Sequence, residues 1–544
     1  MQVAATRPDI LHIPLADALN RLQDSTSSFD DLTAKRIVRR ALQGALRKAQ
    51  HEIEKTQHSS TGLPYIKNND DLQTFLNSLS EKPVAAASIA QVYKGYLPGF
   101  GPVAVKVQRP GIRKKVERDA TLFHSVAEWL EQQKWTRGTP LYGEPLFGTT
   151  QFVKTVDEFT ARVFEDMDFE REVHNMQVFA NLYDPRQGPP SKISRRNPLV
   201  VPKVIPELCT DRIIIMEWLE GTKLIDIQDD IQDKQNSEQE RLESLALVCK
   251  AIESTLSQMF DTGIVHAEPH SANLLKIKGA NGDVKLGYLD FGLVNEIPQR
   301  FRDGIVCAVV QVVFARNIEA VADLCVEVGL LSEEQMKDPS ERKKFLTALE
   351  RAFDNILIWP KNKSGLHTAL PKVRFQNLLT SLAVLIATFK FTVPPYFLNN
   401  ARALATLEGI ALKLDPNFNI LRVIYPYSIN QLMLNPKVSH KAQESFLDIC
   451  RNPETKLVDW NRFMMLLNDW SMFTGHRKRR IFWDLATSAG GRRVGYRIVS
   501  EFFMKRYRRL RNFVLLQKNV IRNGVADDLR MRPMARIRQH QQAS

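Results

Sequence analysis

The 544 residues of this chain exceed what one compact core usually holds, so two or three domains are expected. Hydrophobic residues make up 44% and charged residues 25%, which is ordinary globular composition and excludes disorder over most of the chain. A formal net charge of +14 favours an anionic partner. The five cysteines include no C-x-x-C pair, so neither a disulfide framework nor a zinc site is suggested, and a reducing compartment is expected.

The first elements along the chain are expected to be helical. Residues 8–80 are expected to be helical: residues 8–22 have apolar side chains at helical spacing, and Asp30 and Asp31 are placed to cap a helix that runs to about Glu54. From Val84 the pattern changes to short apolar runs broken by Gly and Pro. These runs predict a β-hairpin with strands at 89–93 and 102–107 and a turn at 98–101.

The remaining pattern predicts a mixture of long helices and a few buried strands. No apolar run is long enough to span a membrane, because the longest, 378–389, meets Lys390 at once. The N-terminus lacks the apolar core of a signal peptide, and the early Asp9 is unusual for a transit peptide. Beyond the hairpin we expect a helix at 112–134, a Gly/Pro-rich linker at 138–148, a helix at 150–181, a strand at 212–216, a polar insert at 229–239, a helix at 242–262 and mainly helices after residue 298.

Three short fragments occur in the order in which a protein kinase uses them. The strand at 103–106 ends in Lys106, and a kinase holds the nucleotide phosphates with a lysine on its third strand. H-A-E-P-H-S-A-N has the spacing of a catalytic loop, with Glu268 as the proton acceptor and Asn273 as a metal ligand. D-F-G begins at Asp290, 17 residues after Asn273, where the aspartate would bind Mg²⁺. Each fragment is weak alone, but their order predicts a kinase-like fold that binds ATP and Mg²⁺.

A candidate adenine site follows the buried strand at 212–216. In M-E-W-L-E-G, Glu217 and Leu219 occupy the segment where a kinase hydrogen-bonds adenine through its backbone. An ordinary strand end is the alternative interpretation of this segment.

Several segments resemble the UbiB family of atypical kinases. Ala85, Ala86, Ala87 and Ser88 lie in V-A-A-A-S-I-A-Q-V-Y, which is similar to the alanine-rich nucleotide loop of that family. G-I-V-H-A-E-P-H resembles the family's catalytic loop, H-A-D-P-H-P-G-N, and D-M-D-F-E-R-E resembles its E-x-D segment followed by R-E. The resemblance covers roughly residues 6–440 and includes segments at 6–11, 402–409 and 414–418.

The resemblance implies an α+β fold, a bilobal protein-kinase-like fold with family-specific helical extensions at both ends. We expect a helical N-terminal extension at 1–80, an N-lobe with a helical insertion at 81–220, a C-lobe at 221–430 and a helical basic C-terminal extension at 431–544.

The resemblance also bears on which glutamate pairs with Lys106. An ordinary kinase spacing would suggest Glu117 or Glu128, whereas the family's insertion points to Glu172; a solvent-facing helix position is the alternative for Glu172.

Three departures from the family pattern bear on turnover. The K-x-G-Q motif that covers the family's active site does not occur, so either the chain is truncated or this member lacks that lid. Glu268 stands where the family has Asp, which displaces the carboxylate by roughly 1.5 Å, and a misplacement of about 1 Å can cost about 10²-fold in rate. Asp166, beside Glu165, stands where the family has Glu. Asn273 and Asp290 are retained, so Mg-ATP binding is less affected than turnover.

Two functions are compatible with this pattern. The first, implied by the resemblance, is an atypical kinase or ATPase that regulates isoprenoid-quinone or prenyl-lipid metabolism in a mitochondrion or plastid. The second is a catalytically weak pseudokinase scaffold at a lipid surface.

Basic clusters at 477–480 and 505–511 are interleaved with aromatic residues, which suits a peripheral helix on an anionic membrane, although a solvated helix face is the alternative. Nucleic-acid binding is not expected, because no supporting fold motif occurs.

Overall fold

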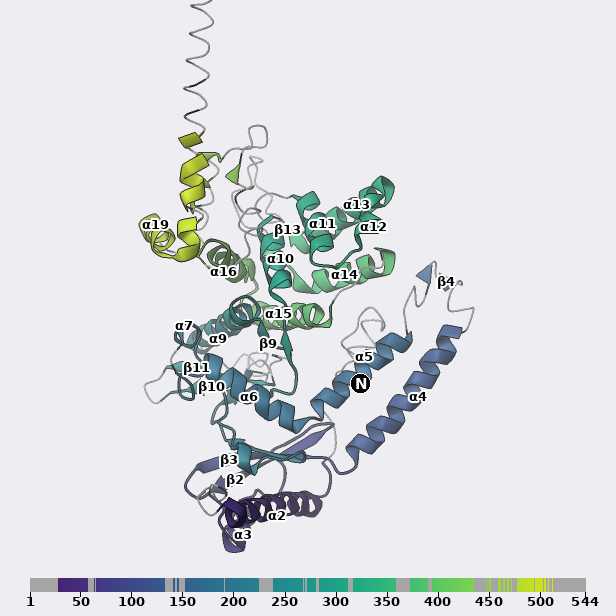
Figure 1. Cartoon of the computed structure of the whole chain (residues 1–544), viewed down its shortest axis with the longest axis vertical. Coiled ribbons are helices and arrows are strands. Elements are labelled where there is room, and N and C mark those ends of the chain that lie inside the picture. The colour runs from purple at the N-terminus through teal and green to yellow at the C-terminus, as the bar shows by residue number, and fades with distance from the viewer. Residues whose placement is uncertain are drawn as a thin grey trace, which may run out of the picture. The chain divides into compact units, whose positions relative to one another are not determined.

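The structure is a computed structural model of the whole chain, shown in Figure 1. Residues group into two compact units, one formed by 1–302 and 322–424 and the other by 303–321 and 425–544. The predicted domain boundaries at 80, 220 and 430 stay a prediction. The structure describes residues 28–56, 63, 65–132, 140–141, 144–145, 152–189, 191–224, 238–267, 269, 272–279, 283–311, 317–358, 372–389, 394–434 and parts of 447–511.

The first sheet contains the predicted hairpin. Strands β1 (Ala85–Ala86), β2 (Ala90–Leu97), β3 (Gly101–Gln108) and β7 (Ile213–Glu217) pair antiparallel in the order β1-β2-β3-β7. The turn between β2 and β3 uses two glycines in the left-handed region, Gly99 at φ 82° and Gly101 at φ 115°, which side chains rarely adopt. The predicted hairpin and the predicted strand at 212–216 are therefore confirmed.

Two helices cover one face of this sheet. α2 (Asp31–Thr56) begins where Asp30 Oδ2 accepts the Thr33 N–H at 2.9 Å, so the predicted cap is confirmed. α2 and α3 (Asn69–Ser78) lie beside β2 and β3 in Figure 1 and form one core with the sheet. Val103, Val105 and Val107 of β3 belong to that core and are fully buried. Because side chains alternate along a strand, Lys106 points to the opposite face.

The predicted helix at 150–181 is wrong, because the structure has two helices there. α5 (Phe152–Asp166) ends before Asp168, whose side chain accepts the Arg171 N–H at 3.0 Å and caps α6 (Phe169–Tyr183). A capping carboxylate favours the start of a new helix over the continuation of the preceding one, and the helical spacing of the apolar residues did not reveal this. α5 packs beside α4 (Ile112–Gln132), and the predicted linker between these helices contains the short paired strands β4 (Pro140–Leu141) and β5 (Glu144–Pro145).

A second sheet is formed by four short strands. Its order is β6 (Leu199–Val200), β11 (Val284–Tyr288), β10 (Leu274–Lys278), β8 (Thr222–Lys223). A separate pair joins β9 (Ile264–His266) to β12 (Val294–Glu296). α9 (Glu238–Ser257) packs against β11 and α15 (Pro395–Leu414) and runs into a π-helical turn, η3 (Gln258–Thr262). The predicted helix at 242–262 is thus present, but its last turn widens.

The remaining described elements are mainly helical, as predicted. None of the helices that the structure describes is both long and apolar enough to cross a bilayer. The predicted helix at 8–22 and most of the polar insert at 229–239 lie outside the described residues. The other elements are α7 (Lys192–Arg196), η2 (Pro206–Leu208), α10 (Gln299–Val310), α11 (Ile318–Glu327), α12 (Glu333–Lys337), α13 (Pro339–Ile356), β13 (Leu357–Ile358), β14 (Lys372–Val373), α14 (Phe375–Phe389), α16 (Leu421–Leu434) and α19 (Lys478–Thr487).

Candidate nucleotide site

Lys106 of β3 and Glu172 of α6 meet inside the first unit. The Lys106 Nζ lies 2.7 Å from Oε1 and 2.8 Å from Oε2 of Glu172. The Glu172 side chain is 1% exposed and that of Lys106 is 15% exposed, so water screens this pair little. The predicted contact is confirmed. The alternatives, Glu117 and Glu128, each pair with a neighbour within α4.

The charges around Lys106 keep it protonated. Burial lowers the pKa of the Lys106 ammonium, but the carboxylates of Asp290, at 3.4 Å, and Glu172 outweigh burial and raise this pKa above its usual range. Burial also raises the pKa of Glu172 to about 7, although the ammonium of Lys106 opposes that shift. The site therefore holds a fixed positive charge between two carboxyl groups.

Asp290 is oriented by its own turn and remains accessible. Its Oδ1 accepts the Gly292 N–H at 3.0 Å, while its Oδ2 lies near Lys106. The side chain is 44% exposed, in contrast to that of Glu172. Each carboxylate oxygen can accept more than one partner, so a solvent-accessible carboxylate with these contacts can also bind a metal ion.

Phe291 anchors the D-F-G segment to α6. Its side chain is fully buried, and its ring contacts the rings of Phe179 on α6 and His266 on β9 edge-on, with centroids 5.3 and 5.5 Å away. Asn175, also on α6, donates its side-chain N–H to the Phe291 carbonyl at 2.9 Å. In a kinase the lysine–glutamate pair and the D-F-G aspartate must be in place together, and here one helix fixes both.

The catalytic-loop segment lies against the D-F-G segment. The His266 ring nitrogen Nε2 contacts the carbonyl oxygen of Asp290, and the Leu289 N–H donates to the Asn273 carbonyl at 3.0 Å. Asn273 and Asp290 supply an amide and a carboxylate oxygen, which are ligands that Mg²⁺ uses together with phosphates and water. These residues therefore fit the ion by donor chemistry. Glu268 lies outside the described residues, so its role stays a prediction.

The alanine-rich segment forms a tight turn at the end of the sheet. Ala85 and Ala86 form β1 and pair with β2, and the Ala87 N–H donates to the Ala90 carbonyl at 2.8 Å. Arg109 donates from Nε to the Ala87 carbonyl at 2.9 Å. Ala85, Ala87 and Ser88 are exposed, so short side chains leave this backbone accessible to a ligand. Whether Ala85, Ala86, Ala87 and Ser88 bind nucleotide stays a prediction.

The candidate adenine segment at 217–221, called the hinge below, follows β7, as the sequence predicts. Glu217 is the last residue of β7, and Val103 of β3 lies opposite it. The Trp218 N–H donates to the Pro102 carbonyl at 3.1 Å, and Leu219 follows. A Cβ atom on Gly221 would lie 2.5 Å from the Lys276 carbonyl oxygen, so only glycine lets the chain pass β10 here.

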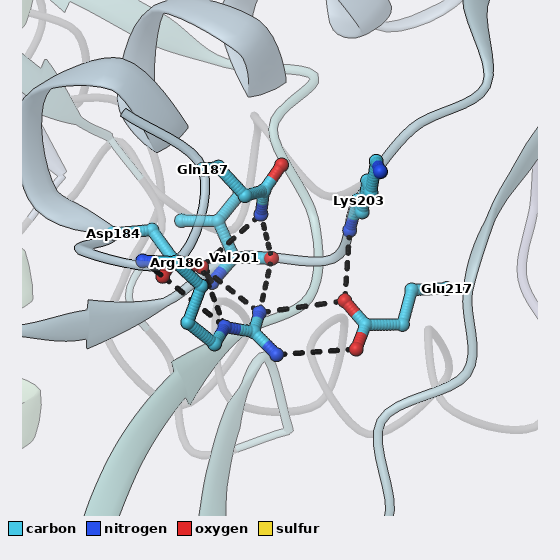
Figure 2. Close-up of polar contacts among 6 residues, drawn as sticks. All are labelled: Asp184, Arg186, Gln187, Val201, Lys203 and Glu217. Carbon is cyan, nitrogen blue, oxygen red and sulfur yellow. Dashed lines mark hydrogen bonds and ion pairs between the residues drawn. The ribbon is translucent and has the colours of Figure 1, made fainter. Parts of the chain in front are cut away.

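A polar network fixes the Glu217 side chain, as Figure 2 shows. Arg186 Nη1 lies 3.1 Å from Glu217 Oε1, and the Lys203 N–H donates to Oε2 at 3.1 Å. Arg186 also binds the fully buried carboxylate of Asp184, with Nη2 2.9 Å from Oδ2. Burial would raise the pKa of Asp184, but the Arg186 guanidinium and the Val201 N–H outweigh burial and hold this pKa below its usual range.

This network joins two parts of the candidate site. Asp184 directly follows α6, which carries Glu172, while Glu217 opens the hinge. Arg186 therefore couples the position of α6 to that of the hinge. Sequence reasoning did not identify Asp184, Arg186 or Asn175. The Asp-x-Arg spacing after a predicted helix end was the available signal, but it is common on protein surfaces and carries no specificity alone.

Comparisons with known proteins identify the family. A family model described as the ABC1 atypical kinase-like domain matches residues 66–325, and one described as the UbiB helical domain matches residues 366–419. Together they match more than half of the chain. The chain belongs to the ABC1/UbiB family of atypical kinase-like proteins. The predicted family and the predicted kinase-like α+β fold are therefore confirmed.

Relatives of this chain include plant and cyanobacterial proteins. It is 31% identical over 436 residues to Protein ACTIVITY OF BC1 COMPLEX KINASE 3, chloroplastic, of Arabidopsis thaliana, over 80% of this chain and 51% of that protein. It is 29% identical to an uncharacterised Synechocystis protein, over 86% of this chain and 57% of that one. The chain spans about half the length of the curated relatives it matches.

Solved structures with lower similarity include two mycobacterial proteins. A Mycobacterium tuberculosis protein in complex with erythromycin is 18% identical, with a TM-score of 0.39, over 74% of this chain and 93% of that chain. The PknI kinase domain of the same organism is 14% identical, with a TM-score of 0.20, over 51% of this chain and 89% of that chain.

Proposed function

We propose that this protein binds Mg-ATP and acts as an atypical kinase or ATPase. The observation that carries the proposal is the buried contact of Lys106 with Glu172, at 2.7 Å, next to the exposed carboxylate of Asp290, at 3.4 Å. A buried lysine without a partner would destabilise the folded state, and one carboxylate is enough to neutralise its ammonium. The second carboxylate therefore leaves a surplus of negative charge. The surplus negative charge suits a site that also receives a cation.

Each candidate residue has a distinct role in this proposal. Lys106 would bind the nucleotide phosphates, with Glu172 fixing its position. Asn273 and Asp290 would hold Mg²⁺, which neutralises phosphate charge when it is bound. The backbone of Glu217 and Leu219 would hydrogen-bond adenine, and the exposed turn at 85–88 would lie over the phosphates.

Thermal shift with Mg-ATP tests nucleotide binding. We expect millimolar Mg-ATP to raise the melting temperature of the wild type, because a ligand that binds only the folded state stabilises it. Lys106→Ala and Asp290→Asn should each abolish most of that rise. Lys48→Ala and Asp283→Asn, at exposed positions outside the site, are matched controls that should retain it. A wild type that shows no shift would refute the proposal.

A turnover assay of Glu268 variants distinguishes the proposed enzyme from a pseudokinase scaffold. If Glu268 is the base, shortening it to Asp restores the family's carboxylate position, so Glu268→Asp should raise steady-state ATPase activity and Glu268→Gln should abolish it. A decrease with Asp would mean that the loop compensates for the longer side chain. Equal rates for the wild type and both variants would show that residue 268 is not the base. The absence of turnover together with ATP binding would favour a pseudokinase scaffold.

The names of several relatives support a proposal about the cellular setting. Several carry the word chloroplastic in their names, and we extend a plastid location to this chain. Within plastids the proposal is a regulator of isoprenoid-quinone or prenyl-lipid metabolism. A fluorescent fusion of the full-length protein that accumulates in mitochondria would contradict the location.

Surface chemistry in the second unit favours attachment to anionic lipid. Residues 477–480, at the start of α19, are all basic and exposed. Trp483, in the same helix, is 69% exposed, and farther along the chain Phe503 is 63% and Tyr507 62% exposed. Basic and aromatic side chains together suit an interfacial segment. Binding to anionic vesicles should exceed binding to neutral ones and should fall with salt, because salt screens exposed charges; equal binding to both would contradict a charge mechanism.

A further inference from the structure

A groove between α13 and α14 is separate from the candidate nucleotide site. The two helices are antiparallel, because Phe345 contacts Phe389 at one end, with ring centroids 5.3 Å apart, while Asn377 donates to the Asn355 carbonyl at the other, at 2.9 Å. The groove lined by residues 340–355 of α13 and 380–389 of α14 has a volume of about 900 Å³. This is within the range of small-molecule sites.

Small side chains keep the floor of the groove open. Ala348 and Ala352 of α13 face Leu385 and Val384 of α14 across it. Val384 is 61% exposed, although valine is usually buried. From Ser340 to Asn355 the groove extends about 22 Å along α13 at the helical rise. Five serine and threonine side chains also line the groove, but most of its lining surface is apolar, so it suits one extended hydrocarbon chain.

The rim of the groove is basic. Lys343, Lys344 and Arg351 line it, against a single carboxylate, Glu341. Lys344 pairs with Glu341 at 2.8 Å, in an exposed contact that contributes little stability. Among the described residues, no carboxylate lies within ion-pair distance of Arg351. The groove thus combines an apolar floor with uncompensated positive charge beside it.

We infer that this groove binds a single-chain amphiphile with a phosphate head group. Its chain would lie over Ala348, Ala352 and Val384, and its phosphate would bind Arg351 and the lysines on the rim. Arginine suits this role because its planar fork matches phosphate oxygens. A neutral lipid would leave the rim charge unmatched, and free phosphate would leave the floor exposed. This inference does not depend on nucleotide binding.

Calorimetric titration of the full chain without nucleotide tests this inference. The probe is oleoyl lysophosphatidic acid below its micelle concentration, compared with neutral monoolein and with glycerol 3-phosphate. We expect the lysophosphatidic acid to bind at least about tenfold more tightly than either comparison compound, a difference of about 1.4 kcal/mol. If monoolein binds as tightly, the charged rim has no role. If glycerol 3-phosphate binds as tightly, the apolar floor has none. Either result overturns the inference.

Two groove variants and one control separate this site from other binding. Arg351→Glu should weaken binding of the lysophosphatidic acid about tenfold by reversing the rim charge, and Val384→Glu should do so by placing a charge on the floor. Both positions are exposed, so folding should survive, which melting curves check. Lys48→Glu, on the exposed face of α2, makes the same charge change and should leave binding within about twofold. Equal affinities for Arg351→Glu and Lys48→Glu, or unchanged affinity in Val384→Glu, would place the probe elsewhere and overturn the inference.

Discussion

Replacing Glu172 with glutamine isolates the charge that holds Lys106. The substitution keeps the size and an acceptor oxygen but removes the carboxylate 2.7 Å from the Lys106 Nζ. Removing one partner of a buried ion pair costs about 3–5 kcal/mol, because the other charge stays buried and unpaired. Here Asp290 remains 3.4 Å from the Lys106 Nζ, and burial, which raises the pKa of Glu172, already opposes its ionisation. We therefore expect a smaller loss, of about 2 kcal/mol.

A second carboxylate nearby provides the matched control. Glu165 pairs with Arg171 at 3.0 Å, but these side chains are 40% and 32% exposed. Glu165→Gln should cost at most about 1 kcal/mol, as exposed pairs do. Replacing both partners of the buried pair, in Lys106→Met/Glu172→Gln, should cost less than Glu172→Gln alone, because no unpaired ammonium remains.

Urea unfolding of these variants measures the differences. The chain has two compact units, so the transition that reports on the first unit must be followed separately. Mg-ATP affinity, measured in parallel, should fall about tenfold in Glu172→Gln, because Lys106 is then held only by Asp290 and competes with the metal for it. If Glu172→Gln and Glu165→Gln lose the same stability, the buried pair does not contribute as argued. If the double variant is the least stable, the cost does not come from an unpaired charge.

Three further predictions concern other positions. Burial raises the pKa of Glu408 to about 7, and its carboxylate accepts the Phe375 N–H. The folded state therefore loses stability as pH rises from about 4.5 towards 7. Glu408→Gln, which keeps the acceptor oxygen, should have a higher melting temperature than the wild type at pH 8 and the same one near pH 4.5. A melting difference that is independent of pH would contradict this. Gly221→Ala should lower the free energy of unfolding by about 1–3 kcal/mol through the clash with β10. Gly44→Ala, in open space within α2, should raise it by about 0.5–1 kcal/mol. Changes of the same sign for both variants in denaturant titrations would refute the steric reasoning. Arg186→Met should weaken Mg-ATP binding and lower the melting temperature, because it leaves the buried Asp184 without its cation; retained affinity would show that the hinge does not depend on this network.

The sequence by itself determined the elements that obey local rules. Alternating β-branched residues and two glycines specified the hairpin of β2 and β3, and Asp30 specified the start of α2. The order of Lys106, Asn273 and Asp290 identified the kinase-like fold, because their spacing reflects roles in one site. Local rules failed at 167–168, where one capping bond of Asp168 ends a helical pattern that periodicity alone would continue.

Only the tertiary structure decided which groups meet. Lys106 and Glu172 are 66 residues apart, and ordinary kinase spacing suggested Glu117 or Glu128 until the family resemblance was considered. The network of Asp184, Arg186 and Glu217 and the groove between α13 and α14 left no mark in the sequence. The physical reason is that burial and charge pairing depend on distances in space, and a residue's local pattern reports only which face of its own helix or strand it occupies.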